Sequence, residues 1–299
     1  MAEPRSKVMG LPDAAALVRD GSRLAIGGFA VYQKPMAFLR ELVRQRRRNL
    51  TVVGVANGPD LDMLVAGGCV ARVETSYVGL EKHGLALNFR RAAEAGAISV
   101  VDYPELASWD RFRASEEGFA FWPCSFLGGS DILRTNPDIR PFDCPMTGRK
   151  LHAIPAADPD AVVIHAIAAD AQGNVVLPAR RLLPQHHDLS LARSCDTVIV
   201  TVEKIVEKDF IRRHADHVQI PSYRTRAVVE LPWGAHPTPL LGRYLMDDAH
   251  MAEYVAAAAD AGAMAAYLDA YVTGVSHADY LARLGPSRLG ALQDLDMPA

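Results

Sequence analysis

The 299-residue chain lacks several features that would assign it quickly to a class of protein. No apolar run approaches the roughly 18 residues that a membrane-spanning helix needs, and residues 1–7 lack the apolar core of a signal peptide. Its four cysteines are scattered without a C-x-x-C pair, which is typical of free thiols in a reducing compartment. These absences predict a cytoplasmic protein that does not bind a membrane.

Other absences narrow the chemistry. The net charge is −3, so no overall basic field indicates a nucleic-acid partner. The chain contains no G-x-S-x-G elbow, no Walker loop and no H-E-x-x-H helix. His186-His187-Asp188 resembles a metal-ligand cluster, but adjacent side chains on regular structure point apart and the flanking sequence is loop-like. We therefore expect a solvated loop there, and no metal site.

What is present is an alternation of strand-like and helix-like segments. Continuous apolar runs such as 161–166 and 197–202 are typical of parallel strands that are buried on both faces. The pattern predicts an α/β fold, with an open, mostly parallel sheet flanked by helices and a helical C-terminal tail. We expect a single domain over 1–299, with the α/β core at about 1–240 and the tail at about 241–299. Residues 124–152 show little periodicity and are expected to form a long loop.

A glycine turn follows the first predicted strand, 23–26. Gly27 and Gly28 allow a tight turn and a close approach to a ligand, and Pro35 opens the helix expected at 36–43. Free N–H groups at such a helix start favour an anion or a developing oxyanion. The alternative is an ordinary strand-to-helix connection, because the full G-x-G-x-x-G fingerprint is absent.

Two carboxylates also follow predicted strands. Glu105 comes after the strand expected at 98–101, and Glu81 after the β-rich stretch 71–78. Ligands of open parallel sheets bind outside the carboxyl ends of the strands, where a carboxylate can act as a base, a nucleophile or a positioning group. Alternatively, Glu105 is simply an acidic residue that the helix dipole stabilises.

Three further residues have two readings each. Gly128 and Gly129 lie in the expected long loop, where they either approach a ligand or form a turn. His165 lies inside an apolar strand, which favours a buried histidine with a hydrogen-bond partner over a role in a site.

Several stretches in a shared order carry a resemblance to a known family. They are Gly27-Gly28-Phe29 with Lys34-Pro35-Met36, 51–54 with Gly58-Pro59-Asp60, 76–81 with Gly84-Leu85 and 88–91, Tyr103-Pro104-Glu105, 144–148, His165 with Ala169-Asp170 and Gly173-Asn174, 198–206 and 230–238. Through them the chain resembles, over almost its whole length, the alpha (A) subunit of family I CoA-transferases, of the glutaconate CoA-transferase type.

This resemblance implies a partner. Members of the family work with a beta (B) subunit, often as an α2β2 heterotetramer, and use a coenzyme A thioester as substrate without a permanently bound cofactor. The nucleophilic glutamate lies on beta and forms a glutamyl-CoA thioester. The present chain would then supply the facing wall of the site. Its expected substrate-binding residues are Gly27, Gly28, Phe29, Tyr32, Lys34, Gly79, Glu81, Gly128 and Gly129.

The resemblance leaves three functions open. The first is a CoA-transferase subunit that acts on a carboxylic, preferably dicarboxylic, acyl-CoA. The second is a ring-opening hydrolase or a decarboxylase on the same scaffold, in which Glu105 of this chain performs the catalysis. The third is a non-catalytic subunit that completes the pocket of its partner.

Overall fold

The computed structural model describes residues 5–179 and 187–294, and its centre is a nine-stranded sheet. Seven parallel strands follow the order β14-β12-β10-β1-β2-β4-β6. Their bounds are β1 (Arg23–Ile26), β2 (Leu50–Val53), β4 (Val70–Thr75), β6 (Ser99–Asp102), β10 (Ala161–Asp170), β12 (Val198–Val206) and β14 (Thr225–Glu230). The short strands β11 (Val175–Val176) and β13 (Val218–Ile220) extend the sheet in antiparallel fashion. The predicted open, mostly parallel sheet is confirmed.

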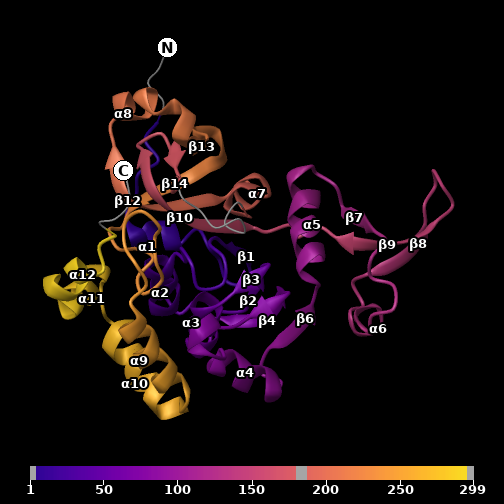
Figure 1. Ribbon diagram of the computed structural model, residues 1–299, viewed down its shortest axis with the longest axis horizontal. Coiled ribbons are helices and arrows are strands. Elements are labelled where there is room, and N and C mark those ends of the chain that lie inside the picture. Colours follow the sequence, from indigo (N-terminus) through magenta and orange to yellow (C-terminus); the bar gives the residue numbers. More distant parts are fainter. Residues whose placement is uncertain (1–4, 180–186, 295–299) are drawn as a thin grey trace.

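Helices cover both faces of this sheet (Figure 1). Side chains alternate between the faces along a strand, so Leu24 and Ile26 enter one core whereas Ala25 enters the other. The first core contains residues of α1 (Leu11–Ala15), α2 (Met36–Arg44), α3 (Pro59–Ala66) and α4 (Leu87–Glu94), and the second contains residues of α5 (Glu105–Glu116) and α7 (His187–Arg193).

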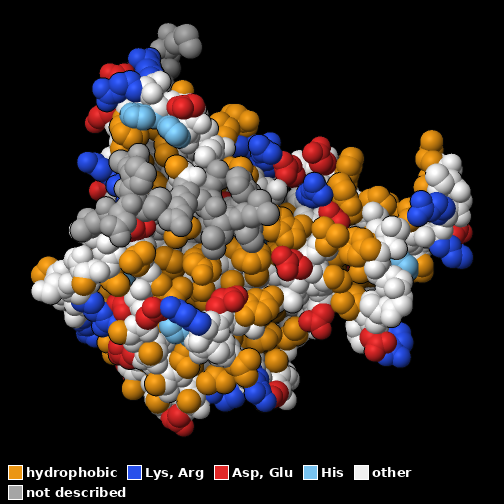
Figure 2. Space-filling model, viewed as in Figure 1, with side chains coloured by type: hydrophobic (Ala, Val, Ile, Leu, Met, Phe, Trp, Pro, Cys, Tyr) orange, Lys and Arg blue, Asp and Glu red, His pale blue; other side chains and the backbone are white. Residues whose placement is uncertain are grey.

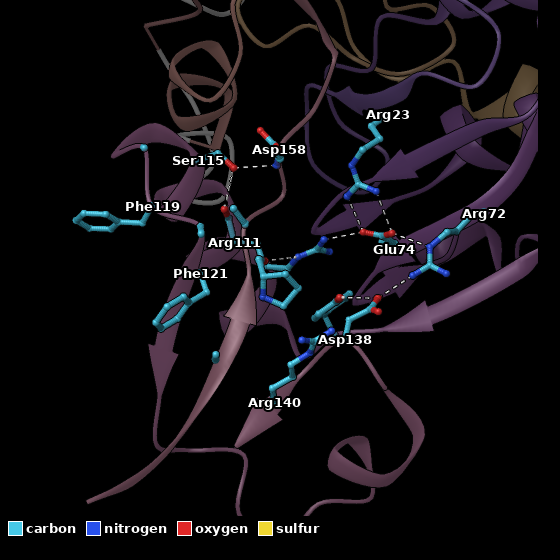
Figure 3. Close-up of a pocket in the computed structure, with 16 residues that line it drawn as sticks. Arg23, Arg72, Glu74, Arg111, Ser115, Phe119, Phe121, Asp138, Arg140 and Asp158 are labelled. Atoms are coloured by element: carbon cyan, nitrogen blue, oxygen red, sulfur yellow. Dashed lines mark hydrogen bonds and ion pairs between the residues drawn. The ribbon is translucent and has the colours of Figure 1, made fainter. Parts of the chain in front are cut away.

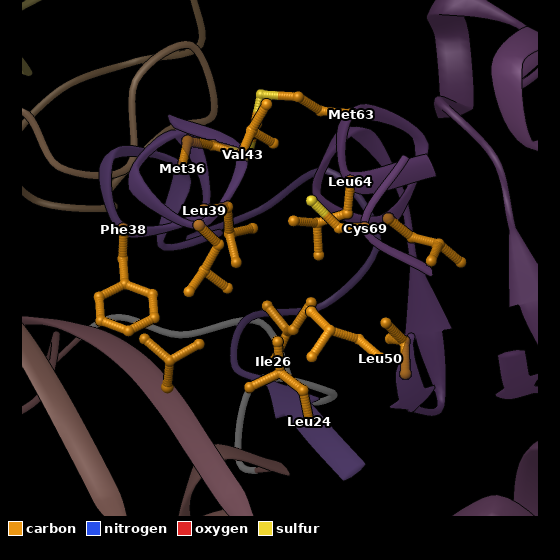
Figure 4. Packing of buried hydrophobic residues seen from close by; sticks show 14 of the residues in the cluster. Leu24, Ile26, Met36, Phe38, Leu39, Val43, Leu50, Met63, Leu64 and Cys69 are labelled. Atoms are coloured by element: carbon orange, nitrogen blue, oxygen red, sulfur yellow. The ribbon is translucent and has the colours of Figure 1, made fainter. Parts of the chain in front are cut away.

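Side chains of α2 pack into the first core beside those of β1, β2 and α3 (Figure 4). Phe38, Leu39 and Leu42 recur at helical spacing and are completely buried. Burying each such side chain contributes about 1.5–3 kcal/mol. This packing fixes α2 against β1, and so fixes the glycine turn between them.

The predicted C-terminal helices are also confirmed. They are α9 (Asp248–Ala258), α10 (Ala261–Tyr271), α11 (His277–Leu284) and α12 (Pro286–Ala291). A further short helix, α8 (Lys208–Arg213), follows β12 and precedes this C-terminal group. Tyr254 on α9 donates a 2.6 Å hydrogen bond to Asp62 on α3, and Arg288 on α12 bonds Asp247 just before α9. The C-terminal helices therefore pack on the α/β core through buried polar contacts as well as apolar ones. The division of the chain near residue 240 stays a prediction.

The segment that we expected as a long loop is instead ordered. Together with β7 (Phe121–Cys124), it contains α6 (Ile132–Thr135), β8 (Arg140–Asp143) and β9 (Lys150–Pro155), and the three strands pair antiparallel in the order β7-β9-β8. We call residues 121–155 the arm, because they project from the body beyond α5 (Figure 1). Pro123 and Pro141 interrupt the sequences of β7 and β8, which hides the alternation that would have indicated these two strands.

A small separate core holds the arm. Cys124, Leu127, Ile139 and Ile154 pack with residues of β6 and α5, including Val101 and Ala107. Hydrophobic side chains are nevertheless exposed over the arm and the neighbouring α5 (Figure 2), among them Met146, which is 88% exposed. Within the part of the chain that the structure describes, no helix is long and apolar enough to cross a membrane.

Candidate functional site

A cavity of about 530 Å³ opens at the carboxyl ends of β4 and β6. We call it the site cavity. Its lining comes from the turn after β1, the segment after β4, the start of α5 and α6, and consists of Phe29, Ala56, Ser76, Tyr77, Glu81, Asp102, Tyr103, Pro104, Glu105 and Ile132. This is the edge of an open parallel sheet at which ligands usually bind, and its volume is that of a small-molecule pocket. The expected residues Phe29, Glu81 and Glu105 therefore meet in one cavity.

Three carboxylates line this cavity, those of Glu81, Asp102 and Glu105, and all three residues are exposed. Glu105 is the first residue of α5 and follows Pro104. Within the described ranges its carboxylate has no hydrogen-bond or ion-pair partner, so it is available to a ligand. An acidic group at a helix start is also stabilised by the helix dipole, so both readings of Glu105 remain compatible with its position.

Tyr77 and Glu81 form the rim opposite α5. Burial raises the pKa of the Tyr77 phenol, and the nearby Glu81 carboxylate adds to that rise. Glu81 has a φ of 53°, in the left-handed region, at the start of a short 3₁₀ helix, Glu81–His83. A Cβ at Gly79 would overlap the Tyr77 hydroxyl, so glycine there makes room for this ring. Gly79 itself lies under the rim rather than in the lining.

The glycine turn contributes differently from what we expected. The N–H of Gly27 donates to the carbonyl of Val163 at 2.8 Å, and the N–H of Gly28 donates to Asp188 Oδ1 at 2.7 Å. The Phe29 N–H donates to the carbonyl of Tyr32 at 3.1 Å. These donors are all used within the chain, so the turn presents the Phe29 ring to the cavity rather than free N–H groups.

Lys34 contacts the glycine turn with its buried side chain. Its side chain is completely buried, and its ammonium lies 3.2 Å from Asp60 Oδ2 and 3.3 Å from the Gly28 carbonyl oxygen. It also donates to the carbonyl of Ala56, which lines the site cavity. Lys34 therefore positions two segments of the wall. Tyr32 is half-buried and, like Lys34, is not part of the lining.

Gly128 and Gly129 lie in an exposed turn of the arm, outside the lining of the site cavity. Gly129 has a φ of +83°, which glycine adopts easily, and a Cβ at either residue would meet open space. The neighbouring Ile132, on α6, does reach the cavity.

The prediction of a solvated loop at His187 and Asp188 was wrong, and His186 lies outside the described residues. His187 opens α7 and packs edge-on against Trp109 and Phe112, at ring-centroid distances of 4.7 and 4.8 Å. Burial, with a contribution from the Lys34 charge, lowers the pKa of His187 to about 3, so its ring is neutral. Asp188 is buried, and the hydrogen bond that it accepts from Gly28 helps to compensate the loss of solvent.

His165 is buried with partners, as predicted. Its Nδ1 lies 2.8 Å from Thr201 Oγ1, and its Nε2 lies 2.8 Å from Glu203 Oε1. Among the described residues there is no group of three or more His, Cys, Asp and Glu side chains that could hold a metal ion.

Some residues of the lining were not predicted from the sequence. Ser76, Tyr77 and Asp102 all come directly at or after the ends of β4 and β6. A position just after a predicted strand was the criterion that selected Glu81 and Glu105, and the same criterion would have selected these three residues.

Replacing Gly28 with alanine is expected to lower the free energy of unfolding by at least about 2 kcal/mol. Gly28 has a φ of +74°, and an added Cβ would lie 2.6 Å from the Gln33 carbonyl oxygen and still closer to that of Tyr32. Strain of this kind costs about 1–3 kcal/mol before any clash is counted. Urea denaturation would measure the loss. Gly96→Ala is the matched control, because Gly96 has a φ of +66° but open space around it; equal losses in the two variants would contradict the predicted clash.

Comparison with known proteins agrees with this architecture. The family model for coenzyme A transferase matches residues 8–231. An uncharacterized protein of Archaeoglobus fulgidus is 34% identical over 96% of the chain, although the chain spans only 64% of that protein. The A subunit of glutaconate CoA-transferase from Acidaminococcus fermentans is 31% identical, with 95% of this chain and 93% of that protein covered. A cholesterol ring-cleaving hydrolase IpdA subunit of Rhodococcus jostii is 30% identical, with 94% and 97% covered.

Solved structures give the same result. The crystal structure of glutaconate coenzyme A-transferase from Acidaminococcus fermentans matches with a TM-score of 0.92 at 30% identity, over 97% of this chain and 96% of that chain. A variant of the decarboxylase AibA/AibB matches with a TM-score of 0.79 at 31% identity, over 89% and 98%. The matching family model, together with relatives of this identity and coverage, shows that the chain belongs to the coenzyme A transferase family and is similar to its glutaconate-type alpha subunit.

Proposed function

We propose that this chain is the alpha subunit of a heteromeric CoA-transferase, which moves coenzyme A between a carboxylic acyl-CoA and an acceptor acid. The likeness to the A subunit of glutaconate CoA-transferase in both sequence and structure, over nearly the whole of each chain, is the observation that carries this proposal. The partner would be a beta subunit, in an α2β2 assembly, and the coenzyme A thioester would be the substrate rather than a resident cofactor.

The reaction is proposed to use a glutamate of the beta subunit. Its carboxylate takes coenzyme A from the acyl-CoA as a glutamyl thioester, and the donor acid leaves; the acceptor acid then takes coenzyme A from that thioester. The site cavity of the present chain is the facing wall. Phe29, Tyr77 and Tyr103 supply aromatic surface against which an acyl chain can pack.

The charge of the cavity lining limits which acyl groups this chain can bind by itself. The site cavity carries three carboxylates and, in the described residues, no Lys, Arg or His. A dicarboxylic acyl group has a second carboxylate, which needs a cation or N–H donors. We therefore propose that a dicarboxylic substrate, if used, is held at its distal end by the beta subunit.

The surroundings of the cavity support a covering partner. Leu106, beside Glu105, is 54% exposed, and Leu85, near Glu81, is 56% exposed. Tyr77 on the rim is 41% exposed. Large apolar side chains gathered around a functional site are typical of surfaces that another chain covers.

Replacing Glu105 with glutamine separates this proposal from the alternative in which Glu105 is the catalytic base. If the nucleophile is on beta, Glu105 only contacts the substrate, and kcat of the Glu105→Gln variant should change less than about threefold. Its KM should rise about tenfold, because one charge-assisted hydrogen bond to the substrate is lost. Glu117→Gln is the matched control, because Glu117 is exposed at the other end of α5. Steady-state kinetics of the co-expressed complex would measure both constants.

The second candidate is a hydrolase or decarboxylase in which Glu105 is the catalytic base. It is favoured by the exposed, unpartnered carboxylate of Glu105 in the cavity and by the likeness to the decarboxylase and to the ring-cleaving hydrolase. Under this candidate Glu105→Gln should lower kcat by about 10²–10⁴-fold, the usual contribution of a general base, with assembly intact. A non-catalytic subunit that completes the partner's pocket would show altered affinity at both Glu105 and Glu81 and an unchanged kcat.

A further inference from the structure

A second cavity of about 900 Å³, drawn in Figure 3, shares Tyr103 of its lining with the site cavity. Strands β1 and β4 form one wall, with Arg23, Arg72 and Glu74, and the second half of α5 and the arm form the others. Arg111 enters from α5 and Arg140 from β8. We call it the arginine cavity, because these four guanidinium groups line it.

Most of the charge in this cavity is paired at Glu74. Its carboxylate lies 2.9 Å from Arg23 Nη2, 2.7 Å from Arg72 Nε and 2.6 Å from Arg111 Nη2. Asp138 Oδ2 accepts from Arg72 Nη2 at 2.8 Å. Three arginines thus share two carboxylates, and positive charge is left over.

Two of these guanidinium groups carry donors that have no partner among the described residues. Arg111 is 2% exposed, yet its Nη1 has no hydrogen-bond partner in the described part of the chain. A buried donor without a partner costs about 1–3 kcal/mol. Arg140 likewise has no hydrogen bond or ion pair through its guanidinium within residues 5–179 and 187–294. Figure 3 shows both side chains directed into the cavity from different elements.

The rest of the lining sets the kind of ligand. Asp158 also faces the cavity, so the four arginines stand against three carboxylates and the lining has a net positive charge of one. Phe119 and Phe121 also belong to the lining and are 56% and 41% exposed, but Figure 3 shows both rings directed away from the guanidinium groups. The net positive charge therefore favours a small anionic molecule.

We infer that the arginine cavity binds a small carboxylate- or phosphate-bearing molecule, whose oxyanion accepts hydrogen bonds from Arg111 Nη1 and Arg140. Guanidinium groups suit this role because their planar N–H donors match the oxygens of carboxylates and phosphates. The inferred site is separate from the site cavity and does not depend on the proposed transferase activity.

Isothermal titration calorimetry on the full chain, with inorganic pyrophosphate and with citrate as probes, tests the inference. At least one probe should bind saturably with one site per chain. Arg140→Gln should weaken that binding about tenfold or more, the loss of a charge-assisted hydrogen bond. Because Arg140 is exposed and unpartnered within the described ranges, the substitution should leave the fold intact. Comparison of the two probes identifies the preferred head group.

Arg149→Gln is the matched control, because Arg149 is an exposed arginine of the arm outside the cavity lining. Saturable binding by neither probe, or equal weakening in both variants, would overturn the inference. So would loss of probe binding when the beta subunit is co-expressed and bound, because the cavity would then be a surface for that partner.

Discussion

Glu74→Gln is expected to lower the free energy of unfolding by about 3–5 kcal/mol, the usual cost of removing one partner from a buried ion pair. Glu74 is 3% exposed and receives hydrogen bonds from Arg23, Arg72 and Arg111. Without the carboxylate, the positive charges of these guanidinium groups would be less well compensated, and β4 would lose its ion pairs with Arg23 on β1 and Arg111 on α5. Urea denaturation near pH 7 would measure the change.

The control is Glu94→Gln, because Glu94 pairs with Arg90 on the exposed face of α4. An exposed pair contributes about 0–1 kcal/mol, so this variant should unfold almost like the natural protein. Similar losses in the Glu74 and Glu94 variants would contradict the role that we assign to the buried network.

The same network predicts a pH dependence. Although burial opposes ionisation, the hydrogen bonds from Arg23 and the charge of Arg111 lower the pKa of Glu74 from 4.5 to about 2. Because the pKa is lower in the folded state, the stabilisation is fully present above about pH 4.5 and is lost as the pH falls toward about 2. The stability of Glu74→Gln should therefore fall less over that interval. Parallel loss of stability in both proteins would count against this assignment.

The second large effect concerns the partner. The purified chain alone is expected to show no CoA exchange, and co-expression with a beta subunit should produce it. The reason is that the site cavity is an open wall whose carboxylates, by our proposal, are not the nucleophile. Exchange between a radiolabelled acid and its acyl-CoA would measure the activity. Full exchange by the chain alone would rule out the proposed division of labour.

The central sheet was predictable because its signals are local. The strands Ala161–Asp170 and Val198–Val206 contain runs of apolar residues, which indicate burial without reference to the rest of the chain. The helix Met36–Arg44 has apolar residues at helical spacing. The arm was not predictable in this way. Pro123 and Pro141 lie within its strands, and its small core depends on residues from β6 and α5 that are distant in sequence.

The candidate site was predictable in part, for a related reason. Position after a strand identified Glu81 and Glu105, which the fold brings into one cavity. The sequence does not show which backbone N–H groups are free to bind a ligand. The N–H of Gly28 donates a hydrogen bond to Asp188, which lies 160 residues away in the sequence. Asp188 is buried, and the sequence around it does not show that its hydrogen-bond donors come from distant residues, Gly28 and Gln33.

Mass spectrometry of the co-expressed complex, trapped during turnover with an acyl-CoA, tests the central proposal most directly. We predict a coenzyme A thioester on a glutamate of the beta subunit, with none on this chain. A thioester on Glu105 or Glu81, or turnover without any adduct on beta, would contradict the proposal.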